Sequence, residues 1–223
     1  MPLPPEVKAC VFDAYGTLFD IAAPVRRCAD ALGDRAGPLA ALWRAKQLEY
    51  CWLRSLMGRH ADFWTLTQDA LDYALEAHGL LADGALRTRL LAAYRTLDAY
   101  PEVPGLLDRL AAAGLRRAIL SNGTPEMLEA AIAAAGLAGR FDAVLSVEAV
   151  GIYKPAPAVY RLACDRLGLA PAEIAFFSSN GWDAAGAAGF GFHVVWVNRA
   201  GLPAERMPDG PAAVVPNLAG VAP

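Results

Sequence analysis

Residues 7–17 read VKACVFDAYGT, and this stretch decides the fold. The apolar run at residues 7–12 predicts a buried strand, and Asp13 with the Tyr-Gly-Thr turn that follows predicts a loop at its end. Five further apolar runs predict strands, the last of them short; they lie at residues 117–120, 141–147, 174–177, 193–197 and 213–215. We therefore expect a sheet of about six strands.

Helical patterns lie between these strands, at residues 103–113, 125–135 and 156–167. A glycine, a common helix terminator, follows each pattern. Strands that alternate with helices of this length indicate a parallel sheet covered on both faces. The pattern predicts an α/β protein with a Rossmann-like parallel core.

One segment breaks the alternation. Residues 22–100 contain no convincing strand, and helical periodicity covers residues 39–57, 61–77 and 86–97. A helical block inserted after the first strand would lie above the carboxyl end of that strand, where open α/β sheets bind ligands. We interpret it as a cap over the site; the alternative is a pair of helices packed on the flank of the sheet. The predicted domains are a core of residues 1–20 and 101–223 and a helical cap of residues 21–100.

Composition limits the class of protein. The 223 residues are 56% hydrophobic and 19% charged, enough for a large core and incompatible with whole-chain disorder. The net charge of −3 and the lack of a basic stripe disfavour a nucleic-acid partner. No uncharged apolar run is long enough to span a bilayer, so we expect no membrane partner.

The N-terminus shows no secretory signal, so a cytoplasmic location is expected. The four cysteines, Cys10, Cys28, Cys51 and Cys164, form no CxxC pair and are interpreted as reduced, mostly buried thiols. The histidines do not fall near them at zinc-ligand spacing. No metal or other cofactor is therefore predicted.

Polar clusters follow four of the predicted strands: residues 13–17, residues 121–123, Lys154-Pro155, and residues 178–180 with Asp183. An aspartate at one strand end often only caps a turn. A parallel sheet, however, brings such strand ends together, and four clusters that include an acid and a lysine favour one shared site.

This arrangement closely resembles the haloacid dehalogenase superfamily, a group mostly of phosphatases. The resemblance spans nearly the whole chain and implies an aspartate nucleophile at Asp13. Two departures bear on the chemistry. Tyr15 stands where the phosphatases have a second aspartate, and the last motif has a single acid, Asp183, where Mg²⁺ wants several hard oxygen ligands. A Mg²⁺-dependent phosphatase of the same fold remains the alternative.

The 2-haloacid dehalogenase branch fits better. Residues 13–20 (DAYGTLFD), 43–50 (WRAKQLEY), 54–58 (RSLMG) and 178–183 (SSNGWD) resemble its motifs. The resemblance implies metal-free hydrolysis of (S)-2-haloacids to (R)-2-hydroxyacids through an aspartyl ester. The chemistry is consistent, because a departing halide needs no proton and hence no acid at position 15.

Positive charge must bring an anionic substrate to an anionic nucleophile. Lys154 can favour the ionised form of Asp13 and offset the repulsion. The resemblance implies that Arg44 reaches down from the cap and holds the departing halide, which suits a permanently charged guanidinium. Taken alone, Arg44 would be interpreted as an exposed helix arginine in a surface ion pair, and the resemblance reverses that interpretation. For Lys154 the alternative is a surface lysine in a loop, which the following Pro155 and the match to the superfamily lysine disfavour.

Further roles come from the same resemblance. Thr17 would orient Asp13, and Tyr15 would form part of the pocket wall. Ser121 would bind the substrate carboxylate, while Asn122 and Trp182 would contact the halide. Tyr160 would support Lys154. The hydrolytic water would be positioned and activated by Ser178, Asn180 and Asp183. Core packing is an equal alternative for Trp182 and a close one for Tyr160.

The expected partners are a small anionic 2-haloacid, its halide, and a second copy of the chain in a homodimer. Apolar cap residues such as Trp43, Trp52 and Leu56 could serve that interface or only the cap core. A non-enzymatic binding module is a further alternative, disfavoured by retention of Asp13, Lys154 and Asp183 together. The sequence contains no G-x-S-x-G motif, which disfavours a Ser-His-Asp hydrolase.

Overall fold

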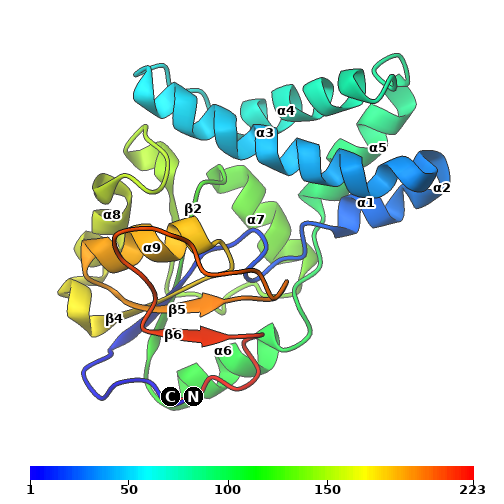
Figure 1. Ribbon diagram of the computed structural model, residues 1–223. Coiled ribbons are helices and arrows are strands. Elements are labelled where there is room, and N and C mark those ends of the chain that lie inside the picture. Colours follow the sequence, from blue (N-terminus) through cyan, green and yellow to red (C-terminus); the bar gives the residue numbers. More distant parts are fainter.

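A computed structural model of the protein describes all 223 residues and contains a six-stranded sheet (Figure 1). Every strand pairs in parallel with its neighbours, in the order β3-β2-β1-β4-β5-β6. The strands are β1 (Ala9–Phe12), β2 (Arg116–Ser121), β3 (Ala143–Ser146), β4 (Ile174–Ser178), β5 (His193–Val197) and β6 (Ala213–Val215). The parallel sheet predicted from the sequence is confirmed, including the short sixth strand.

The two central strands, β1 and β4, are buried along their whole length. Their register places Phe12 opposite Phe177, and the two rings stack with centroids 4.8 Å apart. Burial on both faces explains why these strands read as continuous apolar runs rather than as alternating patterns. From β1 the chain adds β2 and β3 on one side of the sheet and then crosses to β4 on the other side. Open α/β sheets bind ligands at the carboxyl ends of the two strands that flank such a switch point, here β1 and β4.

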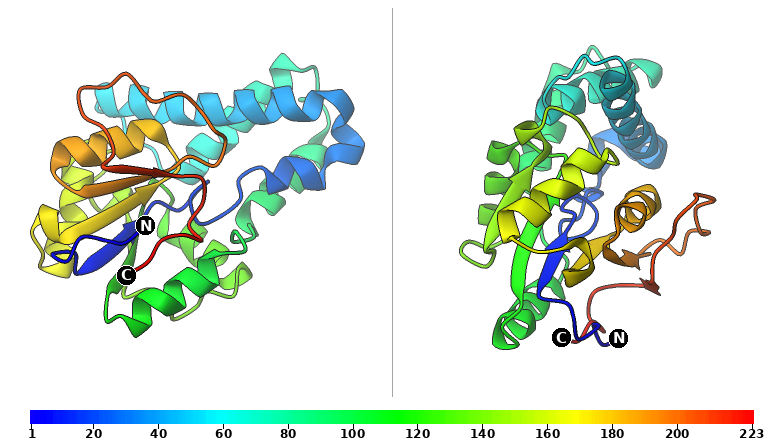
Figure 2. Two further views of the ribbon diagram at one scale, coloured as in Figure 1. Left: turned by 60° about the horizontal axis from the view of Figure 1, so that its bottom comes forward. Right: turned by 90° about the vertical axis from the view of Figure 1, so that its left-hand side faces the viewer.

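Helices α6 (Val103–Ala112), α7 (Pro125–Ala134), α8 (Pro157–Leu167) and α9 (Gly181–Phe190) alternate with the strands and cover the sheet (Figure 2). The first three match the helices predicted from the sequence. Helix α9 has no counterpart among the predictions. Its sequence, GWDAAGAAGF, is nearly apolar all round and rich in glycine, so it carries no amphipathic period.

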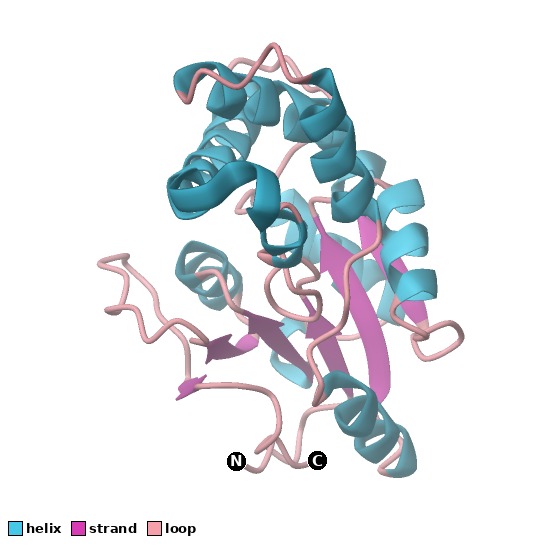
Figure 3. Cartoon of the chain, turned by 90° about the vertical axis from the view of Figure 1, so that its right-hand side faces the viewer, coloured by secondary structure: helices cyan, strands magenta, loops and turns pink.

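Five helices form the insert between β1 and α6: α1 (Ala23–Arg27), α2 (Ala29–Leu32), α3 (Ala36–Leu56), α4 (Phe63–Ala77) and α5 (Gly84–Arg95). They lie together above the sheet (Figures 1 and 3). Asp62 and Asp83 cap α4 and α5 by accepting hydrogen bonds from main-chain N–H groups of the first turn. The short helices α1 and α2 are absent from the predictions because each is barely one turn long.

The insert joins the core through two segments that lie side by side. The main-chain N–H of Asp20 donates to the carbonyl of Asp98, and that of Tyr100 donates to the carbonyl of Leu18. Because the chain passes between core and insert at this paired ribbon, we propose residues 21–100 as a separate cap domain. The fold is thus an α/β core with a helical insert.

Contacts away from this ribbon hold the cap against the core. Tyr153 donates from its hydroxyl to the carbonyl of Ala61, and His60 lies 2.9 Å from a Glu148 carboxylate oxygen.

The four cysteines are all free and buried, as predicted. None of the helices has the length and apolar character needed to cross a membrane.

Candidate active site

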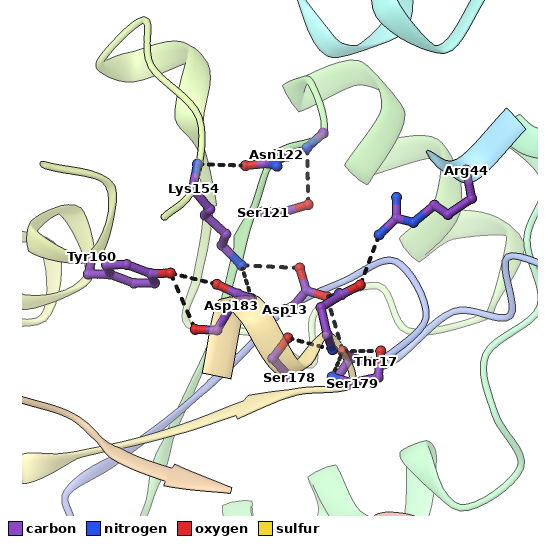
Figure 4. Close-up of polar contacts among 12 residues, drawn as sticks. Asp13, Thr17, Arg44, Ser121, Asn122, Lys154, Tyr160, Ser178, Ser179 and Asp183 are labelled. Atoms are coloured by element: carbon purple, nitrogen blue, oxygen red, sulfur yellow. Dashed lines mark hydrogen bonds and ion pairs between the residues drawn. The ribbon is translucent and has the colours of Figure 1, made fainter. Parts of the chain in front are cut away.

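The Asp13 side chain lies at the carboxyl end of β1 and is 9% exposed (Figure 4). Its Oδ2 accepts hydrogen bonds from Thr17 Oγ1 at 3.0 Å and from Asn180 Nδ2 at 3.1 Å. Its Oδ1 accepts one, from Lys154 Nζ at 3.1 Å. Three donors from three separate segments therefore fix the orientation of one carboxylate.

Lys154 lies between two carboxylates. Its side chain is 1% exposed, and Nζ donates to Asp183 Oδ2 at 2.9 Å as well as to Asp13. Burial alone would lower the pKa of Lys154, but the negative charges of Asp13 and Asp183 raise it above the ordinary value of a lysine. The ammonium therefore stays charged in the core of the protein.

Asp183 lies in the first turn of α9 and is fully buried. Burial raises the pKa of Asp183 above its ordinary value of 3.8, and the negative charge of Asp13 acts in the same direction. The ammonium of Lys154 and the Tyr160 hydroxyl, which donates to Asp183 Oδ1 at 2.8 Å, oppose the shift. A carboxylate with a raised pKa beside the reacting group has the properties of a general base.

Tyr160 packs in the core, and its hydroxyl contacts Asp183 rather than Lys154. Its ring is fully buried and packs against Phe176, Phe190 and Phe192. Burial also raises the pKa of Tyr160, so the hydroxyl keeps its proton and remains a donor. The residue is therefore part of the helix core and also holds Asp183.

The loop after β4 supplies further contacts. Ser178 Oγ accepts from the main-chain N–H of Asn180, and the main-chain N–H of Ser179 donates to Thr17 Oγ1 at 2.8 Å. Thr17 Oγ1 lies within hydrogen-bond distance of both Asp13 Oδ2 and Ser179 Oγ, and we assign its proton to the carboxylate, which is the stronger acceptor. Ser179 thus contacts Thr17 through its backbone and through its side chain, although it was not among the predicted site residues.

Arg44 reaches the core from α3 of the cap. Its Nη2 donates to Asn180 Oδ1 at 3.1 Å, and Nη1 donates to Gln47 Oε1 at 2.7 Å. Figure 4 shows the guanidinium directed toward the cluster around Asp13. The guanidinium is thus one residue removed from Asp13, because Asn180 contacts both Arg44 and Asp13.

Ser121 is the last residue of β2 and Asn122 follows it; both are buried. Ser121 Oγ accepts from the main-chain N–H of Gly123, and Asn122 Oδ1 accepts from the main-chain N–H of Lys154. The Asn122 amide is thereby oriented with its oxygen toward Lys154. Its NH₂ group makes no hydrogen bond to the protein and is free to donate.

Tyr15 and Trp182 are aromatic residues of the core that pack against the cap. The Tyr15 ring stacks on Tyr94 of α5, with centroids 5.7 Å apart, and a Cβ at Gly123 would lie 2.7 Å from it. Trp182 meets Trp52 of α3 edge to face at 5.3 Å, beside an apolar cavity of about 440 Å³ that Lys154 also lines. Trp182 thus forms part of the cap–core junction.

Hydrogen bonds connect most of the predicted site residues into one network that extends from Arg44 to Tyr160, whereas Tyr15, Ser121 and Trp182 are not hydrogen-bonded to it. Gln47 was not among the predicted site residues, although it lies one turn after Arg44. It is a polar residue on the buried, otherwise apolar face of α3, and this break in the apolar pattern could have indicated a role for it. No group of three or more His, Cys, Asp or Glu side chains is arranged to hold a metal ion.

Comparison with known proteins gives a consistent result. The family model of the haloacid dehalogenase-like hydrolases matches residues 7–191. The chain is 53% identical to (S)-2-haloacid dehalogenase 1 of Pseudomonas sp. (strain CBS-3) over 199 residues, 89% of this chain and 88% of the relative. It is 50% identical to (S)-2-haloacid dehalogenase 4A of Burkholderia cepacia over 200 residues, 90% of this chain and 87% of the relative.

A solved structure, the L-2-haloacid dehalogenase of Xanthobacter autotrophicus with chloropropionic acid covalently bound, superposes with a TM-score of 0.86. The two chains are 42% identical, and the aligned region covers 96% of each. The chain belongs to the haloacid dehalogenase-like hydrolases and, within them, to the (S)-2-haloacid dehalogenases.

Proposed function

We propose that the protein is a hydrolytic dehalogenase that converts (S)-2-haloacids to (R)-2-hydroxyacids with inversion at carbon 2. One observation carries the proposal: Asp13 is held by Lys154, Thr17 and Asn180, and the Arg44 guanidinium lies on the far side of Asn180. A nucleophilic carboxylate and a separate cation for the leaving group are what displacement of a halide requires. The names of the relatives and the covalently bound chloropropionic acid in the Xanthobacter protein support it.

In the first step an Asp13 oxygen attacks carbon 2 from the face opposite the halogen. A carbon–oxygen bond forms, the carbon–halogen bond breaks, and its electron pair leaves with the halide. We assign the attack to Oδ1, because it accepts one hydrogen bond whereas Oδ2 accepts two. We assign to Arg44 and the free NH₂ group of Asn122 the stabilisation of the departing anion.

In the second step water attacks the carbonyl carbon of the Asp13 ester and gives a proton to Asp183. Oδ2, now the carbonyl oxygen, gains negative charge between the donors Thr17 and Asn180. When the bond between the Asp13 carbonyl carbon and the ester oxygen breaks, the hydroxyacid leaves with the proton returned from Asp183. The Asp13 carboxyl group then releases the second proton of the water to solvent, which restores the carboxylate. The carbon 2–oxygen bond is untouched in this step, so the inverted configuration is retained.

The remaining residues serve the substrate and the base in this proposal. Ser121 and the neighbouring main chain bind the substrate carboxylate, and Tyr15 and Trp182 form the apolar walls. Tyr160 supports Asp183, to which it donates a hydrogen bond. Ser178 holds the main chain at Asn180, the residue that contacts Asp13.

Halide release from the separate enantiomers of 2-chloropropionate tests the function. We expect chloride from the (S) form, (R)-lactate as the product, and no chloride from the (R) form. The matched control is Asp13→Asn, which keeps the size of the side chain and removes the nucleophile. Equal use of both enantiomers, or undiminished turnover by Asp13→Asn, would contradict the proposal.

We also infer that the protein is a homodimer that acts in the cytoplasm. Leu53, Leu56 and Met57 are exposed at the end of α3, and Leu56 is 85% exposed. Free buried cysteines are typical of reducing compartments. Sedimentation velocity tests the dimer, with Leu56→Glu as the variant expected to be monomeric; a monomer for the unaltered chain would contradict it.

A further inference from the structure

Gln47 is a buried amide in the interior of the cap. It is 1% exposed and shares the buried face of α3 with Leu39, Trp43 and Cys51. Burying an amide is unfavourable unless its polar atoms are paired. Nε2 donates to Thr67 Oγ1 at 2.6 Å and to the Tyr94 hydroxyl at 3.1 Å, while Oε1 accepts from Arg44 Nη1 at 2.7 Å. Both ends of the amide are therefore satisfied, and one of them is satisfied by Arg44.

Thr67 determines which way the amide points. Thr67 Oγ1 donates its single proton to the carbonyl of Phe63, one turn earlier in α4, at 2.7 Å. Toward Gln47 it can then only accept, so the Gln47 NH₂ group must face Thr67. The Gln47 oxygen consequently faces Arg44. A flipped amide would place two sets of N–H donors against each other.

The same network joins three cap helices and extends to the core. Gln47 on α3 contacts Thr67 on α4 and Tyr94 on α5. Burial raises the pKa of Tyr94, so its hydroxyl stays neutral, and its ring stacks on Tyr15, two residues after the nucleophile. The orientation of Gln47 is thus fixed by the assembled cap.

We propose that Gln47 is a positioning residue that holds the Arg44 guanidinium in the orientation needed for the departing halide, and that Thr67 sets the orientation of Gln47. This inference rests on the proposed function. Arg44 has two protein partners, Gln47 and Asn180. Without Gln47 the Arg44 side chain would regain rotamer freedom. Its positive charge would then no longer be held in place when negative charge develops on the departing halide.

The test compares kcat/KM for (S)-2-chloropropionate and (S)-2-bromopropionate, because this constant covers the steps up to halide release. Gln47→Met keeps the length of the side chain and removes the acceptor for Arg44. We expect a loss of about 10- to 100-fold with the chloro acid, as for the loss of one charged hydrogen bond. The loss with the bromo acid should be several-fold smaller, since bromide is the better leaving group.

Three further variants separate positioning from general damage to the cap. Gln47→Glu keeps an acceptor for Arg44 but cannot donate to Thr67 Oγ1. It should therefore lose some activity while returning the ratio of kcat/KM for the two substrates toward the wild-type value. Thr67→Val should give a smaller loss with the same preference for the bromo acid. The matched control is Trp43→Phe, which removes the buried hydrogen bond from Trp43 Nε1 to the Thr67 carbonyl without touching Arg44. It should affect both substrates equally.

Arg44→Ala distinguishes failure of this inference from failure of the proposed function. If Arg44→Ala loses activity equally with both halides, or if the unaltered enzyme releases none, the proposed function fails. If Arg44→Ala is selective while Gln47→Met and Thr67→Val are not, the positioning role is wrong. Adding Gln47→Met to Arg44→Ala should cause no further loss in kcat/KM, and a full additional loss would overturn the inference. If Gln47→Met fails to fold, Gln47→Glu and Thr67→Val decide.

Discussion

The ammonium nitrogen of Lys154 lies 3.1 Å from Oδ1 of Asp13, although the two residues are 141 positions apart in the chain. The parallel sheet makes this contact, because it brings the loop before α8 and the end of β1 to the same edge. The same nitrogen also contacts Asp183. One buried cation therefore serves both the carboxylate that we propose as nucleophile and the one that we propose as base.

Lys154→Met should reduce stability and activity together. It leaves two buried carboxylates without their cation, and breaking such a pair costs about 3–5 kcal/mol in the free energy of unfolding. We expect kcat to fall by about 10³-fold or more, since the charge that stabilises Asp13 is lost. Adding Asp183→Asn to Lys154→Met should recover part of the stability and none of the activity. Urea denaturation and halide release measure the two effects, and an unchanged unfolding free energy for Lys154→Met would contradict this account.

The pH dependence of kcat should report Asp183. Activity is lost as pH falls through the pKa of the base, and burial raises that pKa, so the acid limb should lie above pH 3.8. The Tyr160 hydroxyl donates to Asp183 and favours its ionised form. Tyr160→Phe should therefore move the limb to higher pH.

The matched control for Tyr160→Phe is Phe192→Leu, which alters packing against the Tyr160 ring without removing a hydrogen bond. Its acid limb should stay where the unaltered enzyme has it. If Tyr160→Phe shifts the limb to lower pH, or not at all, Asp183 is not the base.

Removal of divalent cations should leave the reaction unchanged. The positive charge between Asp13 and Asp183 comes from Lys154, and both carboxylates are already engaged with it. Enzyme dialysed against EDTA should release halide at the rate of enzyme dialysed against buffer alone. Loss of activity that Mg²⁺ restores would favour the phosphatase alternative.

The sequence predicted much of the core because the central strands, β1 and β4, are buried on both faces and read as uninterrupted apolar runs. It did not predict α9, whose glycines and alanines carry no period, although Asp183 lies in its first turn. The cluster of polar strand ends followed from parallel topology alone. The inward direction of the Arg44 side chain did not follow from the topology. Periodicity cannot show that a half-buried arginine on α3 turns toward Asn180. That placement depends on Gln47, Thr67 and the packing of the cap helices.

The ester on Asp13 is the central claim, and a single turnover in ¹⁸O-labelled water tests it most directly. With enzyme in excess over (S)-2-chloropropionate, water attacks the Asp13 carbonyl and the product keeps the oxygen that Asp13 gave it. Mass spectrometry should therefore find ¹⁸O in the peptide that contains Asp13 and an unlabelled hydroxyl group in the lactate. Label in the lactate and none in Asp13 would show direct attack of water on carbon 2 and would contradict the account.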